Sequence, residues 1–193
     1  MNYCQCNFDT YSASDNALPV PENLKGKDVR ADPAARAAVF CSTAVIEGVA
    51  DIDLRSLNII VVNREGCASH LHKVVTAIAK RIPRQGLFAR GGPQMLATYA
   101  ALAIGCNGAA FTLVGSRDAL AEAITMALYL AGNGTSSGTI LTVVVNTGRG
   151  RYDASSALIR PADVGSPLAV SEQQAEITIL ERVGTILPED NHA

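Results

Sequence analysis

Ser116 is the residue of this sequence whose position comes closest to that of a catalytic nucleophile. It stands in Gly115–Asp118, between an apolar run typical of a strand and a helical pattern. A nucleophile elbow places a serine at such a turn and needs glycine two residues to either side, so that strand and helix approach closely. Val114 and Asp118 occupy those positions. The sequence therefore favours a helix cap formed by Ser116 or Asp118 over acyl-transfer chemistry.

Cys67, His70 and His72 form a cluster of residue types that bind metals. Four-coordinate zinc needs a fourth ligand, and a closed site usually combines two short-spaced motifs. The one other histidine, His192, lies in the C-terminal tail. On a helix, residues 70 and 72 point about 200° apart, which weakens joint ligation. We therefore expect ordinary surface or core side chains here and no metal site.

Cys106 is a second candidate nucleophile and lies in Gly105–Gly108. The two glycines of this stretch predict a turn, where they serve backbone geometry. A reactive thiolate needs a positively charged neighbour or a histidine base, and the sequence places neither beside Cys106. The remaining cysteines are predicted to pack in the core or have no recognisable spacing: Cys4, Cys6 and Cys41.

The stretch Gly148–Arg151, Gly-Arg-Gly-Arg, is a candidate anion-binding loop. It has no lysine and lacks the glycine spacing of a phosphate-binding loop. The sequence therefore favours a flexible solvated loop. No nucleotide-binding fingerprint occurs elsewhere in the chain, so we expect no cofactor.

Composition limits the classes of partner. The 193 residues are 48% hydrophobic and 18% charged, with a formal net charge of −2, 5% aromatic residues and no tryptophan. This provides enough apolar material for one core, so we expect a single domain over residues 1–193, with less ordered ends at 1–31 and 184–193. The charge balance argues against nucleic acid and anionic membranes as partners.

No stretch reaches the roughly 18 uninterrupted apolar residues of a transmembrane helix. The N-terminal residues Met1–Cys6 lack the basic start and the apolar run of a signal peptide. We therefore expect a cytoplasmic protein whose five cysteines are thiols. Their odd number also argues against a complete disulfide framework.

Hydrophobic periodicity, together with Gly and Pro punctuation, predicts the elements that position these residues. Helices are predicted at residues 32–47, 68–81, 93–104 and 120–131. Strands are predicted at residues 3–8, 57–62, 110–114, 139–145 and 176–181. Helices that alternate with buried strands indicate an α/β protein, here a single layered α/β/α domain with a mixed five-stranded sheet.

The stretch from Gly91 to Asn146 resembles the middle of a β-ketoacyl synthase of the thiolase-like superfamily, with Pro93–Val114 as the matching core. In that family a helix and a Gly-containing turn lead to a strand that ends at the catalytic cysteine, where the next helix begins. Lys27–Arg30 resembles the family's approach to its first long helix. Ala175–Glu181 resembles the strand that closes the family's N-terminal half. The resemblance spans most of residues 25–183 and implies half of a thiolase-like fold.

The same resemblance indicates which catalytic groups are missing. In a gapless alignment over Gly108–Gly134, the family's nucleophilic cysteine falls on Arg117, with Ser116 beside it. A guanidinium stays protonated and is not acylated at any relevant pH. The family's catalytic histidines belong to its C-terminal half, one of them in a His-Gly-Thr-Gly motif that this sequence lacks. The resemblance implies that Arg117 marks a vestigial nucleophile position and that the chain does not condense acyl groups by itself.

Chain-length-factor subunits of this family also lack the cysteine, pair with an active synthase and shape its pocket. In such pairs the strand before the cysteine position lies at the dimer axis. The resemblance therefore implies an interface formed by Ala110, Phe111, Thr112, Leu113 and Val114. We expect a non-catalytic accessory subunit of fatty-acid or polyketide biosynthesis, as a homodimer or as a heterodimer with a ketosynthase. An acyl carrier protein is a further candidate partner.

Two other hypotheses stay open at this point. One is an enzyme of acyltransferase or thioesterase type that uses Ser116 or Cys106 together with residues from a partner. It predicts an acylation that Ser116→Ala or Cys106→Ala abolishes. The other is an unrelated α/β domain with a structural or regulatory role, whose likeness to synthases is one of composition. It predicts a compact monomer.

Overall fold

A computed structural model describes residues 3–14, 32–81, 92–133, 136–163 and 166–187. In chain order the main elements are β1 (Tyr3–Ser14), α1 (Pro33–Ala44), β2 (Leu57–Asn63), α2 (Ala68–Ala79), α4 (Met95–Ile104), β3 (Ala110–Val114), α5 (Arg117–Gly132), β4 (Gly138–Gly148), β5 (Arg151–Pro161), β6 (Val170–Ser171) and α6 (Glu172–Val183). Lys27–Arg30, which entered the family resemblance, lies outside the described residues.

The strands of the described residues form one sheet in the order β3-β2-β4-β5-β1-β6. β2 is parallel to both β3 and β4, whereas β5 is antiparallel to β4 and to β1. A mixed sheet confirms the predicted α/β class, with six strands where the sequence analysis expected five. The strand β3 lies at one end of this order.

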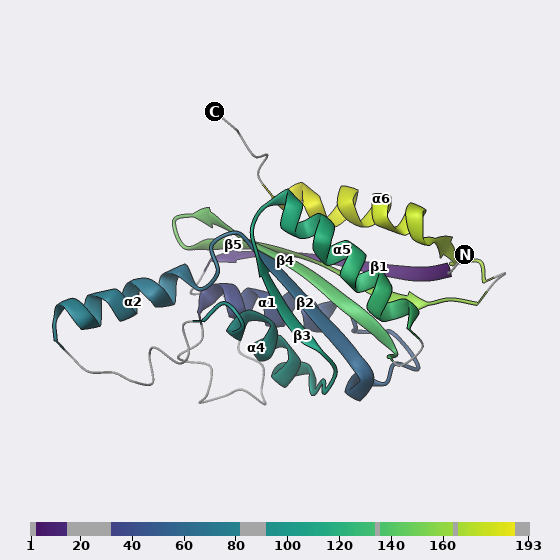
Figure 1. The fold of residues 1–193 in the computed structure, drawn as a ribbon, viewed down its shortest axis with the longest axis horizontal. Helices are drawn as coiled ribbons and strands as arrows, with labels where there is room; N and C mark the ends of the chain where they lie inside the picture. Colours follow the sequence, from purple (N-terminus) through teal and green to yellow (C-terminus); the bar gives the residue numbers. More distant parts are fainter. Residues whose placement is uncertain (1–2, 15–31, 82–91, 134–135, 164–165, 188–193) are drawn as a thin grey trace.

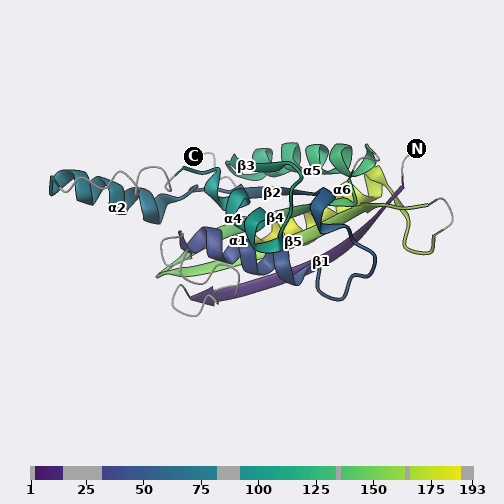
Figure 2. The same cartoon turned by 90° about the horizontal axis from the view of Figure 1, so that it is seen from below.

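Helices cover both faces of the sheet (Figures 1 and 2). α1 and α4 pack on one face, against alternate residues of β2 and β4. α5 and α6 pack on the other face, against the residues in between. This alternation confirms the predicted α/β/α layers, because successive side chains of a strand point to opposite faces. α2 belongs to neither layer and extends away from the sheet.

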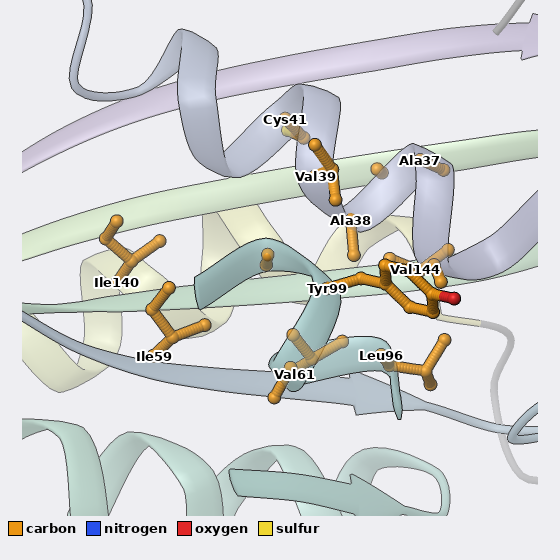
Figure 3. Close-up of a cluster of buried hydrophobic side chains, with 14 of the residues drawn as sticks. Ala37, Ala38, Val39, Cys41, Ile59, Val61, Leu96, Tyr99, Ile140 and Val144 are labelled. Atoms are coloured by element: carbon orange, nitrogen blue, oxygen red, sulfur yellow. The ribbon is translucent and has the colours of Figure 1, made fainter. Parts of the chain in front are cut away.

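The helix α1 begins where the sequence predicts. Oδ1 of Asp32 accepts a hydrogen bond from the backbone N–H of Ala34 at 2.9 Å, and Pro33 fills the first helical position. Most of the helix is buried, and small side chains allow it to lie close to the sheet. Figure 3 shows α1 and α4 packed around a group of aliphatic side chains from β2 and β4: Ile59, Val61, Ile140 and Val144.

A chain of buried hydroxyl groups joins α1 to the middle of the sheet. Ser42 Oγ and Thr142 Oγ1 lie 2.7 Å apart, and Thr142 Oγ1 and Ser156 Oγ are separated by the same distance. All three side chains are fully buried. Because every hydroxyl has a partner, small polar residues are tolerated at the centre of β4 and β5.

The strand β5 was not predicted. Its two central serines are buried in the sheet, where Ser156 bonds to Thr142 and Ser155 Oγ donates to the carbonyl of Asp9 at 3.4 Å. The interpretation of Gly148–Arg151 as a flexible loop is also wrong. Arg149 and Gly150, with φ angles of 52° and 74°, form the two-residue turn between β4 and β5. Positive φ at both central residues is what a type I′ hairpin turn requires.

The predicted final strand at residues 176–181 is wrong, because these residues lie in α6. Ser171 caps the helix, since its Oγ accepts from the N–H of Gln174 at 3.3 Å. The buried residues recur at helical spacing, as Ala175, Ile179 and Val183. Ala175–Glu181 therefore does not match the strand that closes the N-terminal half of a synthase.

The ends of the chain are described in part. Residues 3–14 form β1, which pairs with β5 along nearly its whole length. Residues 15–31 and 188–193 lie outside the described residues. Among the described helices, none combines the length and apolar character needed to cross a membrane.

Candidate functional site

The edge strand β3 is the first part of the candidate site. It pairs in parallel with β2, from Ile59–Ala110 to Asn63–Val114, and no other described strand pairs with its second edge. Its residues are Ala-Phe-Thr-Leu-Val, with no charge. Phe111 is 40% exposed and Val114 is 50% exposed. An uncharged edge with exposed apolar side chains is a template for pairing with another chain.

The turn that precedes β3 fixes its position against β2. A side chain at Gly108 would clash with the carbonyl oxygen of Leu57, so only glycine allows this close approach. The backbone N–H of Ala109 donates to Asn58 Oδ1 at 3.0 Å. The Cys106 thiol donates to the same Leu57 carbonyl. The glycines and Cys106 of the predicted turn therefore hold β3 in the sheet.

The helix α4 supports β3 from one face. The hydroxyl of Thr112 accepts a hydrogen bond from the backbone N–H of Ala97 at 3.2 Å. Ala97 lies in the first turn of α4, so Thr112 satisfies one of the N–H groups that a helix leaves unpaired at its start. α4 ends at Gly105, whose φ of 79° is the left-handed conformation typical of a helix C-cap. The edge strand is therefore held on a rigid support.

The junction from β3 to α5 is the second part of the site. A Cβ at Gly115 would lie 2.8 Å from Ala119 Cβ, so glycine is required where the strand turns into the helix. Ser116 occupies the N-cap position, but its hydroxyl makes no capping hydrogen bond. The predicted cap by Ser116 is therefore wrong. Asp118 lies in the first turn of α5, where its negative charge interacts favourably with the positive end of the helix dipole.

Arg117 is the first residue of α5, directly beyond β3. Its side chain is exposed, and it lines an open cavity of about 340 Å³ with Leu180, Glu181, Gly184 and Thr185 of the α6 end. A guanidinium at the start of the helix offers five donors and no nucleophile. The Ser116 hydroxyl has no hydrogen bond to a histidine or carboxylate within the described residues. This junction therefore has the geometry of a strand-to-helix turn without the groups of a nucleophilic site.

Three buried cysteines, Cys41, Cys67 and Cys106, are poor nucleophiles. Burial raises the pKa of the Cys106 thiol. Burial raises the pKa of Cys67 to about 12 and that of Cys41 to about 11. The thiolate is the reactive form, so a raised pKa leaves little of it at neutral pH. Cys106 is a turn residue whose thiol is bonded to a carbonyl, which does not favour its use as a nucleophile.

Cys67, His70 and His72, the residues of the metal-type cluster, differ in their surroundings. Cys67 is buried, and its thiol donates to the carbonyl of Gly92 at 3.4 Å. His70 is buried at the base of α2, whereas His72 is exposed. In the described part of the chain, no three side chains of His, Cys, Asp or Glu lie close enough together to hold a metal ion.

Asp32 has a second role that the sequence does not signal. Its Oδ1 caps α1, and its Oδ2 accepts from the backbone N–H of His70 at 2.8 Å, in the first turn of α2. One buried carboxylate therefore fixes the starts of two helices. Burial raises the pKa of Asp32, although both hydrogen bonds oppose this shift. The sequence predicted the cap of α1, but the contact with α2 joins residues 38 positions apart.

Comparison with known proteins gives this geometry a context. No family model and no curated protein matches the sequence. Among solved structures, a chain of the ishigamide ketosynthase/chain length factor superposes with a TM-score of 0.66 at 11% identity, over 86% of this chain and 64% of that one. A β-ketoacyl synthase from Burkholderia phymatum gives 0.60 at 11% identity, over 76% of this chain and 46% of that one.

A third similar structure is the ketosynthase in complex with its chain length factor from Xenorhabdus doucetiae. Its TM-score is 0.56 at 11% identity, over 84% of this chain and 80% of the matched chain. The chain thus spans 64% or less of two of these three proteins and most of the third. The protein therefore has the thiolase-like fold of ketosynthases and chain length factors, as the residues around β3 predicted.

Proposed function

We propose that this protein is a non-catalytic, ketosynthase-like accessory subunit of polyketide or fatty-acid biosynthesis. It acts by pairing the open edge of β3 with a strand of a ketosynthase-fold partner. The observation that carries the proposal is the uncharged edge Ala110–Val114, which leads directly to Arg117. Similar solved structures include a ketosynthase together with its chain length factor. This supports a ketosynthase as the partner.

The proposed absence of catalysis rests on the residues at the junction. Condensation needs a thiolate that carries the acyl chain and donors that stabilise the developing negative charge. Arg117 stands at the nucleophile position of the family resemblance, and neither Ser116 nor Cys106 has an activating base among the described residues. The protein therefore contributes surface to a complex rather than an acyl-enzyme intermediate. Its cytoplasmic location stays a prediction.

The pairing is tested by expressing the chain together with a full-length ketosynthase from the same host. Size-exclusion chromatography with light scattering then measures the mass of the purified species. We expect a 1:1 complex with the ketosynthase. A chain that stays monomeric beside the ketosynthase contradicts the proposal, and so does one that forms only dimers with itself.

The absence of catalysis is tested separately, by incubating the chain with an acyl-thioester and with a cerulenin-like probe. Intact-mass spectrometry is expected to show no covalent adduct, while the ketosynthase in the same mixture is labelled at its cysteine. An adduct on this chain that Ser116→Ala or Cys106→Ala removes would instead establish the acyltransferase or thioesterase hypothesis.

A further inference from the structure

The projecting helix α2 carries an exposed apolar stripe. Leu71, Val75 and Ile78 are 55%, 57% and 66% exposed. Their spacing of four and three residues places them on one face of the helix. Figures 1 and 2 show that α2 extends from the body of the protein, with the sheet and the two helix layers to one side. Three aliphatic side chains in a row are therefore left uncovered by the described part of the fold.

This helix has little support within the described residues. Only His70 and Val74 of α2 are buried, and neither lies in its last five residues. An isolated helix of about 12 residues is marginal in water, and most helices in proteins are stabilised by packing of an apolar face. The face that should provide that packing in the second half of α2 is the exposed stripe. The helix therefore needs a covering surface to be stable along its length.

The charged side chains of α2 lie away from the stripe. Lys73 is two residues from both Leu71 and Val75, and on a helix residues two apart point about 200° apart. The stripe itself contains no charged residue. A surface that covers the stripe should therefore be an apolar groove.

The base of α2 adjoins the open edge of the sheet. A Cβ at Gly66 would lie 3.8 Å from Val114 Cγ2, so the turn into α2 contacts the exposed end of β3. The bond from the His70 N–H to Asp32 Oδ2 fixes the first turn of the helix to the body. The helix α2 thus begins beside the exposed end of β3.

The edge strand alone is too small for a stable interface. A strand of five residues is only about 17 Å long. A stable interface buries roughly 800 Å² on each partner, and such an area needs a wider surface than one short strand. Additional surface must come from elements next to β3. The turn into α2 contacts that edge, and packing of the α2 stripe on the same partner would supply part of the missing area.

We propose that α2 is a docking arm that packs its Leu71–Val75–Ile78 face into an apolar groove on the ketosynthase-fold subunit paired with β3. This inference rests on the proposed function, since it names a second contact with the same partner. The arm places a fixed apolar helix beyond the end of the shared sheet. It thereby extends an edge-to-edge contact into a larger interface.

The test compares two double variants of α2 in complexes with a full-length ketosynthase from the same host. Val75→Glu with Ile78→Glu places two negative charges on the apolar face. His72→Glu with Thr76→Glu makes the same change of charge on another face and serves as the matched control. Isothermal titration calorimetry measures the affinity, and circular dichroism checks that each variant is folded. We expect the first variant to bind at least tenfold more weakly than the control.

The outcomes separate the two proposals. If the unaltered chain does not bind the ketosynthase, the proposed function itself fails. If it binds and the two double variants weaken binding equally or not at all, the arm is overturned while the edge pairing stands. If a variant folds poorly, hydrogen exchange on the unaltered chain provides a second test. The amides of residues 71–78 should exchange more slowly in the complex than in the isolated chain. Unchanged exchange at residues 71–78 would overturn the arm. If the full chain then also bound vesicles of anionic lipid through residues 68–81, α2 would instead be a membrane-binding helix.

Discussion

The two ends of the sheet differ in the polarity and the pairing of their edge residues. At one end β6 pairs with Tyr3 and Cys4 of β1, and the rest of β1 is rich in polar side chains, such as Asp9, Thr10 and Ser12. At the other end β3 is short, uncharged and exposes Phe111 and Val114. Proteins protect edges with polar residues when no pairing is wanted. This contrast is what we expect if β1 is a closed boundary and β3, as proposed, pairs with another chain.

The largest effect is expected from charging the β3 edge. Phe111→Lys with Val114→Lys should lower the affinity for a ketosynthase more than a hundredfold, because two charges would be buried without partners. Both side chains are partly exposed in the isolated chain, so folding should be retained. Thr10→Lys with Ser12→Lys adds the same two charges at exposed positions of β1, near the other end of the sheet, and this control should bind normally. Equal binding by the β3 variant and the control would remove the distinction between the two edges.

The next effect concerns α6, which supports the end of the sheet that carries β1. Ile179→Ala should lower the free energy of unfolding by about 2–5 kcal/mol, because Ile179 is fully buried. Ile177→Ala should change it little, since Ile177 is 45% exposed. Urea unfolding measures both. A strand would place residues 177 and 179 on one face, so equal losses for the two variants would contradict the helix.

A smaller effect is expected at Asp32, which caps α1 and anchors α2. Asp32→Ala removes both hydrogen bonds and should lower the free energy of unfolding by roughly 1–2 kcal/mol for each cap. Burial raises the pKa of Asp32, so the folded state holds this proton more tightly than the unfolded state does. The stability due to the protonated group is therefore present below the unfolded pKa and is lost as pH rises through the folded pKa. Unfolding measured from pH 3.5 to 7 should show a larger cost of the substitution at the acid end; a cost that grows with pH would contradict the shift.

No effect is expected from restoring a cysteine at the junction. Arg117→Cys should not give a chain that condenses acyl and malonyl thioesters, because the three histidines of the sequence include no His-Gly-Thr-Gly motif. Mass spectrometry of the products provides the measurement. A condensation product formed by the variant alone would show that the residues needed for catalysis are present after all.

Local signals predicted much of this fold. Asp32 and Pro33 indicated the start of α1, and the β-branched run at 57–62 indicated β2. The errors have a common cause in long-range pairing. β5 is a strand because its buried serines find partners on other strands, and α6 is a helix because Ala175, Ile179 and Val183 meet the sheet. Neither contact is visible within a short window of sequence.

The candidate site was predicted in the same uneven way. The strand Ala110–Val114 and the position of Arg117 after it followed from the sequence. That β3 ends the strand order depends on its pairing with β2, which lies some fifty residues earlier in the chain. The sequence also predicted a helix at residues 68–81, but only the fold shows that this helix projects from the body and leaves an apolar stripe exposed.

Hydrogen exchange at the backbone of Ala110–Val114 tests the central claim most directly. The measurement compares the isolated chain with the chain bound to a full-length ketosynthase. Pairing of the open edge predicts that the outward-facing amides of β3 exchange at least tenfold more slowly in the complex, while those at the β1 edge are unchanged. Exchange at β3 that is the same in both states would show that the edge stays open and would contradict the account.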